Sequence, residues 1–193
     1  GFIDAYDPAT GEREWRTYAI PGPGELGNDT WSGDSWKTGG AATWITGSYD
    51  ADLNQIYWGT GNPGPDWNGD VRLGDNLYSD SVLALDGDTG SIVWHFQFTP
   101  HDVHDYDAIQ IPILADIKFN DRERQVMMWA NRNGFFYTLD RSNGQFLAGK
   151  PYAAQTWAQG LDPATGRPIR VPGMAPTYEG IKKKMKNILK TQL

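Results

Sequence analysis

Residues 85–94 read Leu85-Asp86-Gly87-Asp88-Thr89-Gly90-Ser91-Ile92-Val93-Trp94. An aspartate after an apolar run, a polar turn that ends in glycine, and a tryptophan four residues later together predict a β-hairpin. The Asp86 carboxylate can accept hydrogen bonds from the amides of the turn, and Gly90 supplies the positive φ angle that closes it. The returning strand then places Trp94 against neighbouring structure.

The same pattern recurs along the chain. Two further copies keep the tryptophan, Tyr6-Asp7…Gly11…Trp15 and Tyr49-Asp50…Asn54…Trp58, and two weaker copies lack it, Leu139-Asp140…Gly144 and Leu161-Asp162…Gly166. The clear copies begin at Asp7, Asp50, Asp86 and Asp140, which are 36 to 54 residues apart. This spacing is typical of propeller blades built from four antiparallel strands. The sequence therefore predicts an all-β fold, a partial β-propeller of roughly three to four blades. A solenoid or a β-sandwich with similar turns is the alternative.

The composition agrees with many short strands. The 193 residues include 23 Gly, 12 Pro, nine Trp and nine Tyr, which suits tight turns around aromatic packing. The absence of cysteine excludes a disulfide or a thiolate metal site. No apolar run is long enough to span a bilayer, and no signal peptide is visible. The chain opens directly in a strand-like segment without an initiator methionine, which leads us to expect a fragment of a longer protein.

The net charge of −7 is distributed unevenly. Residues 181–193 contain five lysines and no acid, so residues 1–180 carry 12 basic against 24 acidic side chains. An acidic body disfavours nucleic acid as a partner and is compatible with bound cations or a basic protein. The basic tail has apolar residues at helical spacing, and we expect it to be a short surface helix or a non-native end.

A small set of side chains suggests chemistry. Asp105 and Asp107 are separated by one residue, Asn62 stands in a glycine-rich turn, and Arg132 stands between two asparagines. Carboxylate and amide oxygens are the ligands that a hard cation prefers. A guanidinium suits an anionic, carbonyl-rich cofactor. The residue types therefore predict a cation site that also binds such a cofactor.

The order of these features resembles that of the quinoprotein alcohol dehydrogenases, which are eight-bladed propellers that use pyrroloquinoline quinone (PQQ). The Asp–Gly–Trp repeats resemble the tryptophan-docking motifs of this family. Further matching segments are residues 36–40, 61–63, 74–78, 99–102 and 131–134. The likeness covers about residues 1–180 in consistent order and stops beyond Gly180. We therefore expect a partial quinoprotein propeller domain over 1–180 and a separate tail over 181–193.

The resemblance implies a reaction, the oxidation of a primary alcohol to an aldehyde by hydride transfer to metal-bound PQQ. Asp105 matches the family's catalytic base, which accepts the hydroxyl proton. Arg132 is expected to hydrogen-bond the quinone oxygen, to stabilise charge there and to hold the Asp105 carboxylate. Outside the resemblance, Asp105 reads as a turn-capping aspartate and Arg132 as a surface or turn-stabilising arginine.

The resemblance also implies a metal site formed by Asn62, Asp105 and Asp107. In an extended segment, residues i and i+2 point to the same face, so both carboxylates are expected to reach one ion. The position of Asp107 is non-acidic in calcium-type methanol dehydrogenases and is aspartate in lanthanide-type relatives. We therefore expect a lanthanide ion, with Ca²⁺ as the alternative. A solvated loop aspartate is the simpler interpretation of Asp107, and an ordinary turn that of Asn62.

Trp44 matches the tryptophan on which the quinone ring lies flat. An indole face offers dispersion and quadrupole contact to a planar ring, so the expected cofactor-binding residues are Trp44, Asn62 and Arg132. The competing role is blade packing, to which most of the tryptophans must belong. His101 and His104 lack a third ligand at a spacing that suits zinc, and we expect them to brace their loop by hydrogen bonds.

The resemblance places some family features outside this chain. The remaining metal ligand, a glutamate, and a vicinal cysteine pair lie upstream, so the chain by itself is expected neither to close the ring nor to hold the cofactor tightly. The implied parent is periplasmic, oxidises a small alcohol, passes electrons to a cytochrome c-type acceptor and is compatible with a homodimer. Two other functions stay open, a non-catalytic envelope scaffold and a quinoprotein that oxidises sugars or aldehydes. A scaffold would not need Asn62, Asp105, Asp107 and Arg132 together.

Overall fold

The computed structural model describes residues 1–177, 180 and 182, and β-strands dominate its regular structure. The strands are β1 (Phe2–Tyr6), β2 (Arg13–Tyr18), β3 (Ser48–Asp50), β4 (Gln55–Gly59), β5 (Ser81–Asp86), β6 (Ile92–Gln97), β7 (Ile113–Phe119), β8 (Arg122–Ala130), β9 (Phe135–Asp140), β10 (Phe146–Pro151), β11 (Ala158–Leu161) and β12 (Pro168–Arg170). Short 3₁₀ helices lie in the loops, η1 (Asn28–Thr30), η2 (Ser35–Thr38) and η3 (Gly69–Val71). The tail predicted over 181–193 lies outside the described residues, apart from Lys182.

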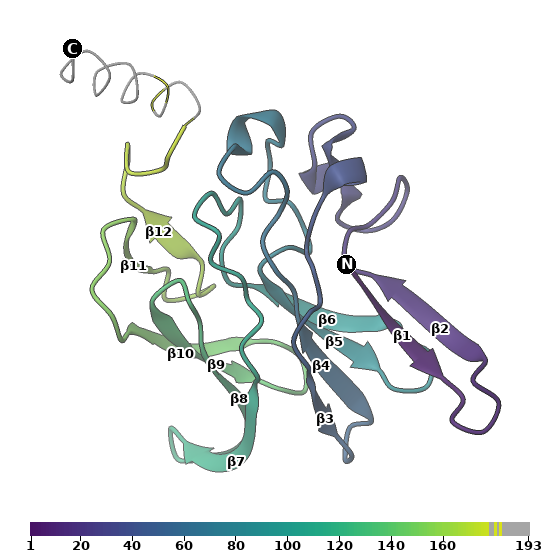
Figure 1. The fold of residues 1–193 in the computed structure, drawn as a ribbon. Helices are drawn as coiled ribbons and strands as arrows, with labels where there is room; N and C mark the ends of the chain where they lie inside the picture. Colours follow the sequence, from purple (N-terminus) through teal and green to yellow (C-terminus); the bar gives the residue numbers. More distant parts are fainter. Residues whose placement is uncertain (178–179, 181, 183–193) are drawn as a thin grey trace.

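The strands form antiparallel sheets in chain order. The first full sheet has the order β3-β4-β5-β6 and the second has the order β10-β9-β8-β7, while β1-β2 and β11-β12 form two-stranded hairpins. The sheets stand side by side, with β1-β2 beside the first full sheet and β11-β12 beside the second (Figure 1). Meandering four-stranded sheets in sequence are propeller blades. The predicted all-β propeller architecture is confirmed, and the solenoid and sandwich alternatives are not adopted.

In three repeats the aromatic residue packs on the glycine of a repeat in the neighbouring sheet. The pairs are Trp15 on Gly90, Trp94 on Gly144, and Phe146 on Gly166. Gly144 has a φ of +75°, and a Cβ there would lie 2.5 Å from Cε3 of Trp94. The glycine is therefore required both by its backbone conformation and by the indole above it. This stacking joins neighbouring blades, as the sequence pattern predicts, and Phe146 replaces the tryptophan that the Asp140 repeat lacks.

The aspartates of the repeats cap their turns. Oδ1 of Asp86 accepts the backbone N–H groups of Asp88 at 3.1 Å and Thr89 at 2.8 Å. The Asp50 repeat lies between β3 and β4, whereas the Asp86 repeat lies between β5 and β6 of the same sheet. Treating each clear copy as the start of a separate blade is therefore wrong. The pattern specifies a hairpin and leaves open which hairpin of the blade it forms.

A buried ion pair links the two full sheets. Nε of Arg141 donates to Oδ2 of Asp50 over 2.5 Å, and both side chains are almost fully buried. The backbone carbonyl of Arg141 accepts hydrogen bonds from the Tyr57 hydroxyl at 2.9 Å and from Nε1 of Trp94 at 3.2 Å. The blade interface is thus both aromatic and ionic, which fixes how the two sheets lie against each other.

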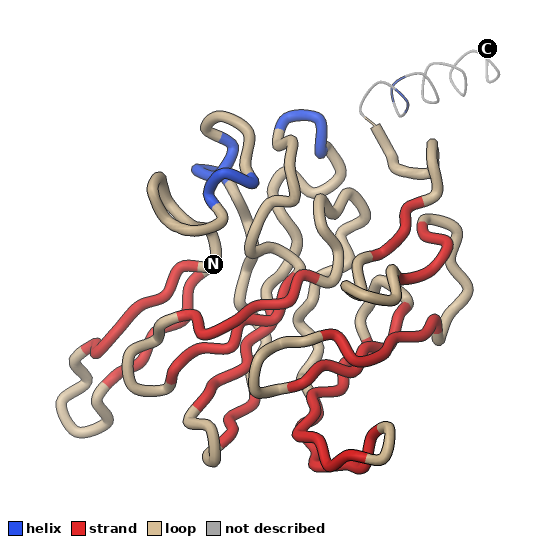
Figure 2. Tube along the Cα trace, turned by 180° about the vertical axis from the view of Figure 1, so that it is seen from behind, coloured by secondary structure: helices blue, strands red, loops and turns tan. Residues whose placement is uncertain are grey.

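The long loops gather at one end of the sheets. In an antiparallel meander, the starts of β3, β5 and β7 lie at the same end as the finishes of β4, β6 and β8. The 3₁₀ helices and most of the loop length lie at this end, opposite the tight hairpin turns (Figure 2). We call this the loop end of the blades. No helix in the described part of the chain is long and apolar enough to cross a bilayer.

Candidate functional site

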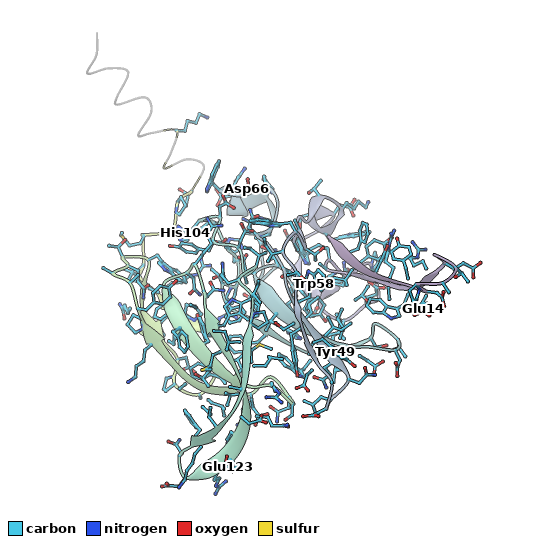
Figure 3. All side chains as sticks on the ribbon, turned by 60° about the horizontal axis from the view of Figure 1, so that its bottom comes forward. Glu14, Tyr49, Trp58, Asp66, His104 and Glu123 are labelled. Atoms are coloured by element: carbon cyan, nitrogen blue, oxygen red, sulfur yellow. The ribbon has the colours of Figure 1, made fainter. Side chains whose placement is uncertain are left out.

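The topology brings the predicted residues to the loop end. Trp44 precedes β3, Asn62 follows β4, Asp105 and Asp107 lie between β6 and β7, and Arg132 follows β8. All five positions are therefore at the same end of two adjacent blades. Asp66 and His104, which are labelled in Figure 3, lie at the loop end, and Tyr49 and Glu123 lie toward the opposite end.

Two glycines let the loop of Asp107 approach that of Asn62. A Cβ on Gly61 would lie 2.6 Å from Oδ1 of Asp107, and one on Gly59 would collide with the carbonyl oxygen of Ala108. Between them, the N–H of Thr60 donates to the backbone carbonyl of Ser81 at 2.9 Å, and the backbone carbonyl of Thr60 accepts the N–H of Ala108 at 3.0 Å. The glycine-rich turn is therefore required by close backbone packing at the site.

Asn62 is bound on both its backbone and its side chain. Its N–H donates to Oδ1 of Asp107 at 2.9 Å, and its Nδ2 donates to Oδ1 of Asp66 at 2.6 Å. The bond to Asp66 fixes the orientation of the amide. With the nitrogen engaged, the amide oxygen is the atom that is left to coordinate a cation.

Asp105 and Asp107 come together differently from the prediction. Both have left-handed backbone conformations, with φ of 62° and 50°, so the expected extended segment is wrong. The turn is imposed by Asp102, whose carboxylate accepts the N–H groups of His104 at 2.8 Å and Tyr106 at 2.7 Å. The two aspartates still interact, because burial and then the charge of Asp107 raise the pKa of Asp105. Asp66 raises it further, and Arg132 opposes the shift.

Arg132 is presented by a turn that two buried asparagines hold. Oδ1 of Asn131 accepts the N–H of Asn133 at 2.9 Å, and Nδ2 of Asn133 donates to the Tyr137 hydroxyl at 2.8 Å. Nη1 of Arg132 then reaches Oδ2 of Asp107 at 3.1 Å. The expectation that Arg132 holds the Asp105 carboxylate is therefore corrected, since its ion pair is with Asp107. The asparagines of the sequence motif are there to shape the turn.

Trp44 is exposed beside the Asn62 loop. Its side chain is 58% accessible, whereas tryptophans in the blade interfaces, such as Trp94 and Trp129, are buried. The segment before it is tied to the Asn62 loop, because the N–H of Ala41 donates to the Asn62 carbonyl at 2.9 Å. Trp44 does not serve the packing of the described blades, which leaves its indole free for a ligand.

The two histidines of the site loop have different surroundings. The Nδ1 of His101 lies 2.9 Å from the carbonyl oxygen of Gly74, so it braces the loop as predicted. The ring of His104 instead packs on Tyr106 and Trp157, with centroids 5.0 and 5.7 Å apart. These aromatic rings line a pocket of about 360 Å³ that reaches Arg132. The pocket gives a small organic molecule room beside the guanidinium.

Four charged residues of the site escaped the sequence analysis. Asp66 holds the Asn62 amide, and Asp102 shapes the Asp105 loop. Arg72 is fully buried and donates to the carbonyl oxygens of Asp66 and Asp102. Asp80 is fully buried directly before β5. Asp66 and Arg72 lie in a Gly/Pro-rich loop and Asp80 in a serine-flanked strand start, and none of them belongs to a local pattern that marks chemistry.

The donor set suits a hard cation. Asn62 contacts Asp107 through its N–H, the charge of Asp107 acts on Asp105, and both carboxylate oxygens of the nearby Asp80 are buried without a hydrogen-bond partner among the described residues. Such an excess of buried negative charge is what a bound cation would neutralise. No cluster of three or more His, Cys, Asp or Glu side chains with metal-binding geometry occurs in residues 1–177, 180 and 182. The amide of Asn62 and the two carboxylates thus fit the cation as a partial set of ligands.

The chain is similar to known proteins over most of its length. The family described as glucose/ethanol/alcohol dehydrogenase, beta-propeller domain (PQQ) matches residues 1–152. Quinohemoprotein alcohol dehydrogenase ADH IIB of Pseudomonas putida is 44% identical over 188 residues, which is 90% of this chain and 27% of that protein. Quinoprotein alcohol dehydrogenase PedH of Pseudomonas putida is 48% identical over 187 residues, 88% of this chain and 31% of that protein.

Solved structures are similar over the same region. Quinohemoprotein alcohol dehydrogenase from Comamonas testosteroni superimposes with a TM-score of 0.83 at 44% identity, over 89% of this chain and 28% of that one. A europium-containing methanol dehydrogenase does so with a TM-score of 0.83 at 36% identity, over 89% of this chain and 33% of that one. The chain therefore spans about a quarter to a third of the length of these relatives.

Proposed function

The chain belongs to the family of PQQ-dependent alcohol dehydrogenases, and from that membership we propose that it is part of a longer quinoprotein that oxidises primary alcohols to aldehydes. The observation that carries the proposal is the meeting of Asn62, Asp105, Asp107 and Arg132 at the loop end of two adjacent blades. A propeller used only as a scaffold has no need for two aspartates in left-handed conformations, one of them buried, beside an arginine and an asparagine.

Each residue has a role that its surroundings support. PQQ, when bound, supplies the two-electron acceptor, and the cation polarises its carbonyl group. Asn62, Asp105 and Asp107 would hold the cation, and the exposed indole of Trp44 would support the quinone ring. Asp105 accepts the alcohol proton as the general base. Arg132 places positive charge where negative charge develops.

We further propose that the cation is a lanthanide. Asp107 adds a second carboxylate to Asp105, and its exposure is only 7%, so its charge is poorly screened by water. High charge and many oxygen ligands favour a trivalent ion over Ca²⁺. The likeness to a europium-containing methanol dehydrogenase is consistent with this preference. We place the parent protein in the periplasm, with a cytochrome c-type domain or protein as its electron acceptor.

The experiment compares the full-length parent with its Asp107→Ala variant in dye-linked alcohol oxidation, after loading with PQQ and either La³⁺ or Ca²⁺. We expect La³⁺-dependent activity that Asp107→Ala abolishes. Asp88→Ala is the matched control, because Asp88 is exposed on the turn between β5 and β6 at the opposite end of the blade. Equal Ca²⁺-dependent activity in both proteins would support the proposed dehydrogenase activity and refute the proposal that the cation is a lanthanide. Failure of the parent to bind PQQ with either ion would refute the proposed enzymatic function.

A further inference from the structure

Asp80 is a buried carboxylate that the proposed reaction does not use. Its exposure is 0%, and neither of its carboxylate oxygens has a hydrogen-bond partner within the described part of the chain. Its backbone is fixed on both sides, because its N–H donates to the Gly61 carbonyl at 2.9 Å and its carbonyl accepts the Phe98 N–H at 2.8 Å. Since Gly61 directly precedes Asn62, and the charges of Asp105 and Asp107 act on Asp80, this residue lies next to the proposed cation ligands.

This residue is held at an energetic cost. Its φ of 48° is left-handed, a conformation that residues other than glycine adopt rarely. Burial raises the pKa of Asp80 well above its usual range, and the charges of Asp102, Asp107 and Asp105 act in the same direction. Arg72 opposes the shift, but its nitrogens donate to other acceptors. No basic group in the described protein pairs with Asp80 directly, so its ionised form is disfavoured unless positive charge is placed nearby.

The site as a whole has more negative than positive groups. The carboxylates are those of Asp66, Asp80, Asp102, Asp105 and Asp107, and the guanidinium groups that face them are those of Arg72, Arg132 and Arg170. Arg132 is paired with Asp107, and Arg170 donates to the carbonyl oxygens of Pro100 and His101. Asp80 is therefore one of the carboxylates of the site that no guanidinium group in the described part of the chain pairs with.

We propose that Asp80 supplies negative charge to the cation site from beside its ligands, and so selects a trivalent over a divalent ion without touching it. The inference rests on the proposed cation site and extends it by one residue. The attraction between a fixed carboxylate and a cation is proportional to the cation's charge. Ionising Asp80 costs the same whichever ion binds, so removing the carboxylate should lower the logarithm of the affinity at least about 1.5 times as much for a trivalent ion as for Ca²⁺.

The test measures cation binding directly in the full-length parent. Tb³⁺ is titrated by its luminescence, sensitised by the protein's aromatic residues, and Ca²⁺ is measured by competition. Asp80→Asn removes the charge at constant size, and asparagine tolerates the left-handed backbone. We expect that a tenfold loss of Ca²⁺ affinity is accompanied by a loss of at least about 30-fold for Tb³⁺. Asp80→Ser should show the same ratio, and Asp88→Asn should show no loss.

A second readout separates a charge-supplying role from a structural one. Because Asp80→Asn relieves an unpaired buried acid, it should raise the thermal unfolding midpoint of the cation-free protein while weakening cation binding. Equal fold-losses for the two ions, unchanged binding, or a lowered midpoint in both variants would overturn the inference and leave the proposed function intact. Tb³⁺ binding that is absent from the wild type, or insensitive to Asp107→Ala, would instead refute the cation site itself.

Discussion

Arg132 and Asp107 form an ion pair across the two full blades, with Nη1 of Arg132 3.1 Å from Oδ2 of Asp107. The other oxygen of Asp107 accepts the backbone N–H of Asn62 at 2.9 Å. One carboxylate thus connects the loop after β4 to the turn after β8. Because the side chain of Arg132 is half exposed, this pair contributes little to stability, and its value lies in the position it gives the guanidinium.

The first prediction concerns Arg132. In the full-length parent, Arg132→Gln should lower kcat for alcohol oxidation about 100-fold, because it removes a donor that stabilises developing charge. Arg132→Lys should retain part of this rate, since the charge remains while the fork of donors is lost. The free energy of unfolding should change by less than about 1 kcal/mol in either variant. Steady-state kinetics gives kcat and thermal unfolding gives the stability, and Arg122→Gln is the control at an exposed arginine. If Arg132 had only a structural role, its variants would lose stability and keep the wild-type kcat.

The second prediction separates two roles of tryptophan. Trp44→Ala should weaken PQQ binding by about tenfold, because a stacked aromatic contact is worth roughly 1 kcal/mol beyond the area it covers. The free energy of unfolding of this variant should hardly change, since Trp44 is 58% exposed. Tyr49→Ala is the matched control, because Tyr49 has the same exposure at the other end of the blade. Equilibrium titration of the metal-loaded parent with PQQ gives the affinities. A loss of stability with unchanged affinity would assign Trp44 to packing.

The sequence predicts more of the fold than of the site. The aspartate, glycine and tryptophan of each repeat act within one hairpin and its neighbour, so residues such as Asp86, Gly90 and Trp94 specify their own structure. The Asp50 repeat was misplaced because the same turn chemistry serves two hairpins of one blade. The pattern therefore predicts the blade but not the number of blades.

The site depends on contacts between distant segments. The sequence predicts an extended segment at Asp105, and the actual turn is made by Asp102, to which the sequence analysis assigned no role. Asp80 meets the site only through the pairing of its backbone with Gly61 and Phe98. Neither arrangement has a signature in the neighbouring sequence. The resemblance predicts which residues belong to the site, and only the folded structure shows that Arg132 pairs with Asp107.

The third prediction tests the stacking between blades. Gly144→Ala should destabilise the protein by more than the about 1–2 kcal/mol that a left-handed alanine costs, because the new methyl group would meet Trp94 at 2.5 Å. Gly24→Ala is the control, since Gly24 has a φ of +87° and nothing lies within 4 Å of the added Cβ. Thermal unfolding of the two variants gives the difference. Equal losses would show that only the backbone conformation matters at Gly144.

The fourth prediction concerns the pH dependence that Asp102 brings. Burial raises the pKa of Asp102 to about 6, although the N–H groups of Tyr106 and His104 and the charges of Arg72 and Arg170 act against the shift. An unfolded aspartate titrates near 3.9, so the folded state binds this proton more tightly than the unfolded state. Asp102 therefore favours folding fully below about pH 4, and this contribution is lost as the pH rises through 6.

The size of the effect follows from the two pKa values. A difference of about two corresponds to about 3 kcal/mol between pH 4 and pH 7. Asp102→Asn cannot ionise, so the thermal midpoint of the wild type should fall relative to that of the variant as the pH is raised over this range. The comparison is made without added cations, and subtraction cancels the other titrating groups that the two proteins share. A wild type whose midpoint rises relative to Asp102→Asn would mean that the carboxylate is ionised in the folded protein, held by Arg72 and the loop amides.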